Sequence, residues 1–177
     1  MAAQENHHTL PHPRFERPTR VLIAVAPYYR AIADGLLEGA RAALEDAQAT
    51  HETVEVPGAL ELPTAIGLAH HSGSFDGYVA LGCVIRGETT HYDTVCNDSS
   101  RGLALLGLQG LCIGNGILTV EDRAQAEVRA DPRGQNKGGG AADAALHLIA
   151  LARRFAPAGL AGVGFRPAAA GTPGGSV

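Results

Sequence analysis

The sequence has few cysteines, no long basic run and no long apolar run, and each shortage excludes a class of protein. Its three cysteines, Cys83, Cys96 and Cys112, are an odd number without C-x-x-C spacing, which argues against a disulfide framework and against a zinc site. We interpret them as small buried apolar residues and expect no metal. The formal net charge of −4, without any basic cluster, argues against nucleic acid as a partner.

Signals for export and for membrane insertion are also missing. The segment 1–20 has no apolar core of the kind found in a signal peptide. No uninterrupted apolar run approaches the roughly 20 residues that cross a bilayer as a helix. We therefore expect a cytoplasmic protein with no membrane partner.

Composition divides the chain into a central domain and two tails. Residues 1–18 combine histidine and proline without periodicity, which predicts a disordered N-terminal arm, and the Ala/Gly/Pro-rich residues 156–177 predict a flexible tail. Residues 19–155 suffice for one domain with a sizeable core. An arm of this composition accounts for its three histidines without a dedicated metal site; they are His7, His8 and His12.

Apolar runs alternate with segments of helical periodicity along the central domain. This alternation predicts a parallel sheet with right-handed crossovers and helices on both faces, a three-layer α/β/α sandwich. The expected strands lie within 21–29, 52–58, 75–85 and 111–119, and the expected helices within 30–47, 60–71, 91–109, 120–130 and 141–156.

Polar and aromatic residues follow the predicted strands. Ligands of such sheets bind beyond the carboxyl ends of the strands, so we expect these residues to converge in space. The four sets are Tyr28 and Tyr29, Ala59 to Glu61, Arg86 to His91, and Asn115 with Thr119.

The segment RGETTH, after the third strand, has the properties of an anion site. Gly87 permits a tight turn, and Thr89 and Thr90 place hydroxyl groups where the free N–H groups of a helix start are expected. The segment fits neither G-x-x-x-x-G-K-[ST] nor G-x-G-x-x-G, which argues against a nucleoside triphosphate or a dinucleotide. A small phosphate ester is the ligand that the segment favours.

Several of these residues have a structural interpretation beside the functional one. His91 is placed for proton transfer near neutral pH, but it also suits a solvent-facing helix start. Glu61 could bind a ligand or only stabilise a helix dipole. The two tyrosines after the first strand could stack on a planar ligand or simply end a strand. The cations of the glycine-rich segment 129–140, predicted to be a connection between two helices, could equally be solvated; they are Arg129, Arg133 and Lys137.

Four segments, VPGALELP, ALGCVIRGETTHYD, GNGILTVE and NKGG, occur in an order and at intervals that closely resemble the 6,7-dimethyl-8-ribityllumazine synthase family. The resemblance covers roughly residues 20–155. It implies a flavodoxin-like fold with a four-stranded parallel sheet. It also implies a cofactor-free transferase that condenses 5-amino-6-(D-ribitylamino)uracil with 3,4-dihydroxy-2-butanone 4-phosphate, releasing phosphate and water.

The resemblance further implies a role for each matching position. Tyr28 would stack on the pyrimidine, and Glu61 would bind ribityl hydroxyl groups. His91 would transfer protons, and Arg129 would hold the phosphate. The remaining substrate-binding positions are Ala59 and Leu60 through the main chain, Cys83, Val84 and Ile85 beside the heterocycle, Gly87, Glu88, Thr89 and Thr90 around the phosphate, Asn115 at the second wall of the heterocycle pocket, and Lys137 at the edge of the site.

The family implies a ring of subunits with each pocket shared between neighbours, and a functional link to riboflavin synthase. This sequence departs from the family pattern at Pro27 and Tyr28, where many members have Arg-Phe, and at Asn115, where many have an aromatic residue. Its segment 131–139 also differs from the compact loop of members that form sixty-subunit shells, so we expect an isolated pentamer. A binding protein without turnover and a shell protein are the alternative functions; the intact catalytic pattern favours an active enzyme.

Overall fold

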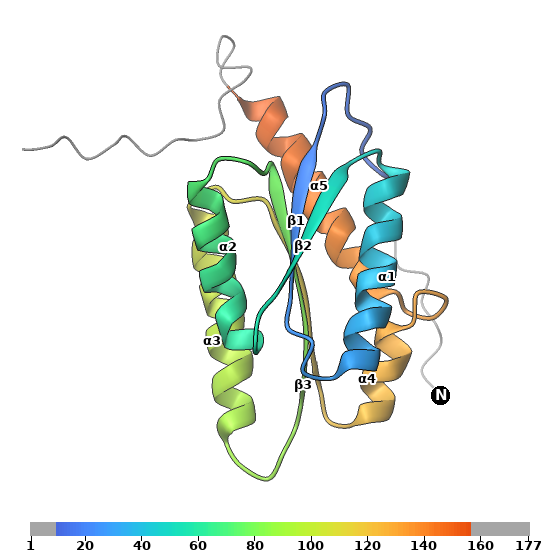
Figure 1. Cartoon of the computed structure of the whole chain (residues 1–177), viewed down its shortest axis with the longest axis vertical. Coiled ribbons are helices and arrows are strands. Elements are labelled where there is room, and N and C mark those ends of the chain that lie inside the picture. Colours follow the sequence, from blue (N-terminus) through green and yellow to red (C-terminus); the bar gives the residue numbers. More distant parts are fainter. Residues whose placement is uncertain (1–9, 157–177) are drawn as a thin grey trace, which may run out of the picture.

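The computed structural model describes residues 10–156, which form a four-stranded sheet between two helical layers (Figure 1). All strand pairs are parallel and the strand order is β2-β1-β3-β4, which confirms the predicted α/β/α sandwich. The elements are β1 (Arg20–Val25), α1 (Arg30–Asp46), β2 (Thr50–Glu55), the 3₁₀ turn η1 (Ala59–Glu61), α2 (Leu62–His71), β3 (Gly77–Ile85), α3 (His91–Leu108), β4 (Ile113–Val120), α4 (Arg123–Ala130) and α5 (Lys137–Phe155).

The central strands bury both of their faces, which explains why they read as continuous apolar runs. Successive side chains of a strand point to opposite faces. On β1, Ile23 therefore packs in the cluster that contains α1 and α5, whereas Leu22 and Ala24 pack in the cluster that contains α2 and α3. Helices α2 and α3 cover one face of the sheet, and α1, α4 and α5 cover the other (Figure 1).

Helix α4 begins later than the sequence predicted. Val120 is the last residue of β4, and the helix starts only at Arg123. Asp122 is its N-cap: the Asp122 Oδ1 atom accepts a hydrogen bond from the Gln125 N–H at 2.8 Å. The side chain of Gln125 reaches back and accepts from the N–H of Glu121 at 3.2 Å, so the helix start is held from both sides.

Helix α5 begins earlier than predicted, and this corrects the interpretation of 129–140 as a connection. Arg129 lies in the last turn of α4 and Lys137 is the first residue of α5, so only 131–136 connects the two helices. Asn136 adopts the left-handed conformation with φ 45°, and its Oδ1 atom accepts from the N–H of Gly139 at 3.1 Å. A capped helix start therefore includes glycines that composition alone assigns to a loop.

Two glycines let α5 lie directly on its neighbours. A Cβ atom at Gly138 would overlap the backbone of Leu36 in α1. A Cβ atom at Gly114, in β4, would overlap the carbonyl group of Ala141 in α5. Helix α5 can approach the strand and the neighbouring helix this closely only because both side chains are absent.

The described part of the predicted N-terminal arm, residues 10–18, runs along α5. The guanidinium of Arg153 lies 5.0 Å from the ring centroid of Phe15 and donates to the carbonyl oxygen of Pro18. His12 pairs with Asp143 at 2.9 Å. His7, His8 and nearly all of the predicted C-terminal tail lie outside the described residues. Within 10–156, no helix is both long and apolar enough to cross a membrane.

Candidate active site at the strand ends

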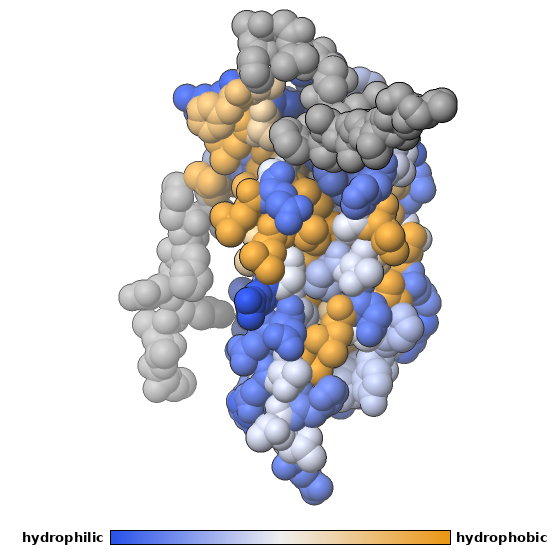
Figure 2. Space-filling model, turned by 90° about the vertical axis from the view of Figure 1, so that its left-hand side faces the viewer, coloured by the Kyte–Doolittle hydropathy of each residue, from blue (hydrophilic) through white to orange (hydrophobic). Residues whose placement is uncertain are grey.

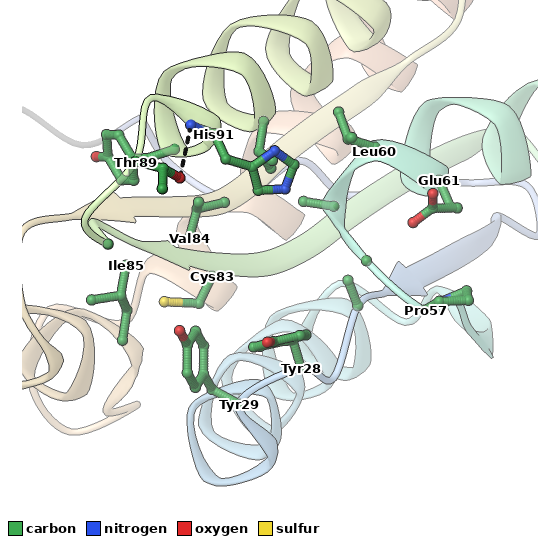
Figure 3. A pocket seen from close by; sticks show the side chains of 16 residues that line it. Tyr28, Tyr29, Pro57, Leu60, Glu61, Cys83, Val84, Ile85, Thr89 and His91 are labelled. Atoms are coloured by element: carbon green, nitrogen blue, oxygen red, sulfur yellow. Dashed lines mark hydrogen bonds between the residues drawn. The ribbon is translucent and has the colours of Figure 1, made fainter.

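A cavity of about 440 Å³ opens at the carboxyl ends of the strands (Figure 3). It brings together three of the four predicted strand ends, those of β1, β2 and β3, with the start of α3. Its lining consists of Ala26, Tyr28, Tyr29, Pro57, Gly58, Ala59, Leu60, Glu61, Cys83, Val84, Ile85, Gly87, Thr89, His91, Tyr92 and Val95.

The link between β1 and α1 provides an aromatic wall. The rings of Tyr28 and Tyr29 meet edge to face with centroids 5.0 Å apart. Tyr29 packs against the core, and its burial raises the pKa of its phenol. Tyr28 remains 75% exposed, so its ring has a free face available to a planar ligand.

The link between β2 and α2 provides a carboxylate. Gly58 precedes η1, and the Glu61 N–H donates to its carbonyl oxygen at 3.2 Å. A Cβ atom at Gly58 would lie 3.0 Å from the Glu61 Oε2 atom, so the turn places this carboxylate close above the glycine. Glu61 is exposed and lies on the side of the cavity opposite Thr89 (Figure 3).

The end of β3 and the start of α3 provide the imidazole. His91 is the first residue of α3, and its N–H lies 3.4 Å from the Thr89 Oγ1 atom. Its ring lies on one side of the end of β3, with the two tyrosines on the other side (Figure 3). The unpaired N–H groups of the first helical turn and the partial positive charge of the helix start lie beside it. This arrangement can hold an anion next to a proton-transferring group.

The thiol of Cys83 lies at the floor of the cavity. Burial raises its pKa to about 11, because a thiolate there would lose its hydration. Cys112, outside the cavity, has its pKa raised to about 11 for the same reason. Cys83 and Cys112 are buried as predicted, whereas Cys96 is only partly buried, which corrects the interpretation of all three as buried residues.

Five predicted site residues do not line this cavity. Asn115 lies in the first half of β4, opposite Ala80, and not at the strand end; the Asn115 Oδ1 atom accepts from the Ile117 N–H at 3.0 Å. The Arg129 Nη1 atom donates to the Gln125 carbonyl oxygen at 3.0 Å on α4. The other three are Glu88, Thr90 and Lys137.

The cavity also contains residues that sequence reasoning did not assign to the site. Tyr92 and Val95 follow His91 on α3. The helical spacing of four residues from His91 could have indicated Val95, whereas the adjacent position of Tyr92 carries no such signal. Tyr29 was recognised as a strand-end aromatic, but the family pattern marks only its neighbour.

Within the described residues, the cavity lacks the positively charged side chain that a complete phosphate site usually has. Among the described residues that line it there is no lysine and no arginine. A phosphate dianion is normally held by at least one charge-assisted pair, most often with arginine. The cavity of a single chain therefore supplies helix dipole and hydroxyl groups but no cationic side chain.

No metal site accompanies the cavity in the part of the chain that the structure describes. Within residues 10–156 there is no group of three or more His, Cys, Asp or Glu side chains placed to hold a metal ion.

Fold and cavity together define a class of protein: a flavodoxin-like α/β protein with a small-molecule site where its parallel strands end.

Comparison with known proteins agrees with this class and narrows it. A family model described as 6,7-dimethyl-8-ribityllumazine synthase matches residues 18–153. A 6,7-dimethyl-8-ribityllumazine synthase of Jannaschia sp. (strain CCS1) is 60% identical over 156 residues, which is 88% of this chain and 86% of that protein. One from Sphingopyxis alaskensis is 57% identical over 135 residues, 76% of this chain and 96% of that protein. The chain therefore belongs to the 6,7-dimethyl-8-ribityllumazine synthase family.

Membership settles the reaction. The chain is a lumazine synthase of riboflavin biosynthesis, an enzyme that condenses the ribitylamino-pyrimidine with the phosphorylated ketone. Enzymes of this family are transferases that act without a cofactor.

Proposed function

We propose that the cavity at the strand ends is the condensation site and that its residues have the roles implied by the family pattern. Tyr28 stacks on the pyrimidine, Glu61 binds the ribityl chain, and the turn 87–90 receives the phosphate. His91 transfers protons beside that phosphate. One observation carries the proposal: Tyr28, Glu61 and His91 come from three separate links of the chain, yet they line one cavity.

The reaction requires several proton transfers near neutral pH. The substrate amine attacks the ketone to give a carbinolamine, which loses water to form an imine; a proton then leaves carbon as phosphate departs, and ring closure expels a second water. An imidazole beside the leaving group can relay these protons. The substrate brings its own nucleophile, so aligned binding supplies much of the advantage and Cys83 needs no covalent role.

We further propose that the cation missing from the cavity comes from a neighbouring subunit. Arg129 lies on α4, about 9 Å along the helix axis from the first residue at 1.5 Å per residue, and is not among the residues that line the cavity of its own chain. In a closed ring, Arg129 and Lys137 reach the site of the next chain.

The cytoplasmic location and the link to riboflavin synthase stay predictions.

Exposed leucines support assembly. Leu68 of α2 and Leu105 and Leu108 of α3 are 71%, 51% and 87% exposed. Figure 2 shows apolar residues gathered over this helical layer. A contiguous exposed apolar surface on a helical layer is typical of a contact with another chain. We propose a pentamer rather than a sixty-subunit shell, and sedimentation velocity measures the particle size directly.

Arg129→Ala should raise the KM for the phosphorylated ketone by about 10- to 100-fold, because a hydrogen-bonded charge pair contributes about 1.5–3 kcal/mol. The KM for the pyrimidine should stay within about twofold, since the guanidinium contacts only phosphate. Steady-state kinetics with each substrate varied in turn measures both values. Arg133→Ala, in the exposed connection, is the matched control. An equal rise of both KM values would contradict the assigned role.

A mixture of two impaired variants, assayed with the phosphorylated ketone well below its KM, tests whether the site is shared. His91→Ala and Arg129→Ala chains, unfolded together and refolded at equal concentration, should recover activity at about a quarter of the sites, because a random ring pairs an intact His91 with an intact Arg129 at that frequency. Each variant refolded alone should stay well below the activity of the mixture at this low ketone concentration. If both residues act within one chain, the mixture will show no recovery, and the shared site is wrong.

A further inference from the structure

Arg86, which directly follows β3, contacts three residues that surround the proposed phosphate turn. Its guanidinium carbon lies 4.1 Å from the ring centroid of Tyr92. The Arg86 Nε–H donates to the Glu121 Oε2 atom at 2.7 Å, and its Nη1 atom lies 3.4 Å from the Asp93 Oδ1 atom. The bond to Glu121 raises the pKa of Arg86, which stays charged.

These contacts bridge two elements. Tyr92 and Asp93 belong to the first turn of α3, directly after His91, and Tyr92 lines the cavity. Glu121 follows β4 and precedes α4, where its own N–H is held by Gln125. Arg86 thus connects the start of α3 to the well-capped start of α4.

The turn between β3 and α3 has few bonds of its own. Thr90, the N-cap of α3, makes no side-chain capping bond, and a Cβ atom at Gly87 would meet nothing within 4 Å. The contact between the His91 N–H and the Thr89 hydroxyl is long, at 3.4 Å. The backbone N–H of Arg86 still pairs with Val120, so the last fixed point before the turn is Arg86 itself.

We propose that Arg86 is a positioning residue, which fixes the phosphate-binding turn and the start of α3 through Tyr92, Asp93 and Glu121. A planar guanidinium can stack on a ring and donate in its own plane to two carboxylates at once; a lysine ammonium has no such plane. The inference rests on the proposed function, because it gives Arg86 its effect through the turn that receives the phosphate.

Stability is not the expected role. Arg86 and its two acidic partners are exposed, and exposed ion pairs contribute little to folding. The effect of Arg86 on the position of the turn is larger than its effect on stability, because a shift of about 1 Å at a binding turn can lower activity by up to about 100-fold. The effect should therefore fall on the affinity for the phosphorylated substrate.

The test compares Arg86→Lys and Arg86→Gln with a control variant, Arg20→Gln, at the opposite end of the sheet. Arg20 makes the same kinds of contact there, an ion pair with Glu52 at 2.6 Å and a guanidinium 5.3 Å from the ring centroid of Phe75. Both Arg86 variants should raise the KM for the phosphorylated ketone about tenfold and leave the KM for the pyrimidine within about twofold. Arg20→Gln should change neither, and all three variants should melt near the wild-type temperature.

Three results would overturn the inference. Wild-type kinetics in Arg86→Lys would show that a positive charge at this position is enough to hold the turn and that the planar guanidinium is not needed. Unchanged kinetics in Arg86→Gln would show that the turn needs no such support. A parallel loss of melting temperature and of affinity for both substrates would show a purely structural role. Thr89→Val separates this test from the proposed function: if that variant leaves the KM for the ketone unchanged, the phosphate site itself is misplaced, whatever Arg86 does.

Discussion

His91→Ala should lower kcat by about 100- to 10,000-fold, the range that a positioned general acid–base group usually contributes. Binding of the pyrimidine should be nearly unchanged, because the imidazole lies on the turn side of the cavity, whereas the tyrosines lie across the end of β3. Stopped-flow or steady-state absorbance of the lumazine product measures the rate, and ligand titration measures the affinity.

Two further variants sharpen this prediction. His91→Gln retains a polar side chain but cannot relay a proton, so it should lose about as much rate as His91→Ala. His71→Ala, at the exposed end of α2, should keep normal turnover. Added imidazole should restore part of the rate of His91→Ala. Full turnover in either His91 variant would remove the histidine from the mechanism.

Gly138→Ala should destabilise the fold by about 3 kcal/mol or more, because the new Cβ atom would overlap the backbone of Leu36 and neither helix can rotate it away. The overlap involves main-chain atoms rather than the end of a flexible side chain, so relief requires α5 to move off α1. Chemical denaturation, followed by circular dichroism, measures the change in the free energy of unfolding.

Gly140→Ala is the matched control, two residues further along the same helix. A Cβ atom there would meet nothing within 4 Å, so the variant should be neutral or more stable by up to about 1 kcal/mol, as expected when alanine replaces glycine in a helix. Equal effects at the two positions would show that helix propensity decides both, and that the close packing of α5 on α1 carries no special cost.

Much of this molecule could be predicted from its sequence because each decisive signal was local. Continuous apolar runs identified β1 and β3 as strands buried on both faces, and parallel strands end at one edge of their sheet. That geometry alone brought Tyr28, Glu61 and His91 to one cavity.

The remaining features depend on contacts that no local pattern encodes. The glycines 138–140 suggested a loop, yet an Asn136 cap and the backbone of Leu36 make them the start of α5. Asn115 was expected near a strand end, but its position in β4 follows from pairing with Ala80. The partner proposed for Arg129, a phosphate in the site of a neighbouring chain, cannot be read from one chain, in which Arg129 does not line the cavity.

The buried thiol at the floor of the cavity affects how the enzyme withstands chemical attack. Peroxides and alkylating agents react with the thiolate, and the burial that raises the pKa of Cys83 to about 11 disfavours the thiolate near neutral pH. We therefore expect Cys83, which lines the cavity, to react slowly with such reagents.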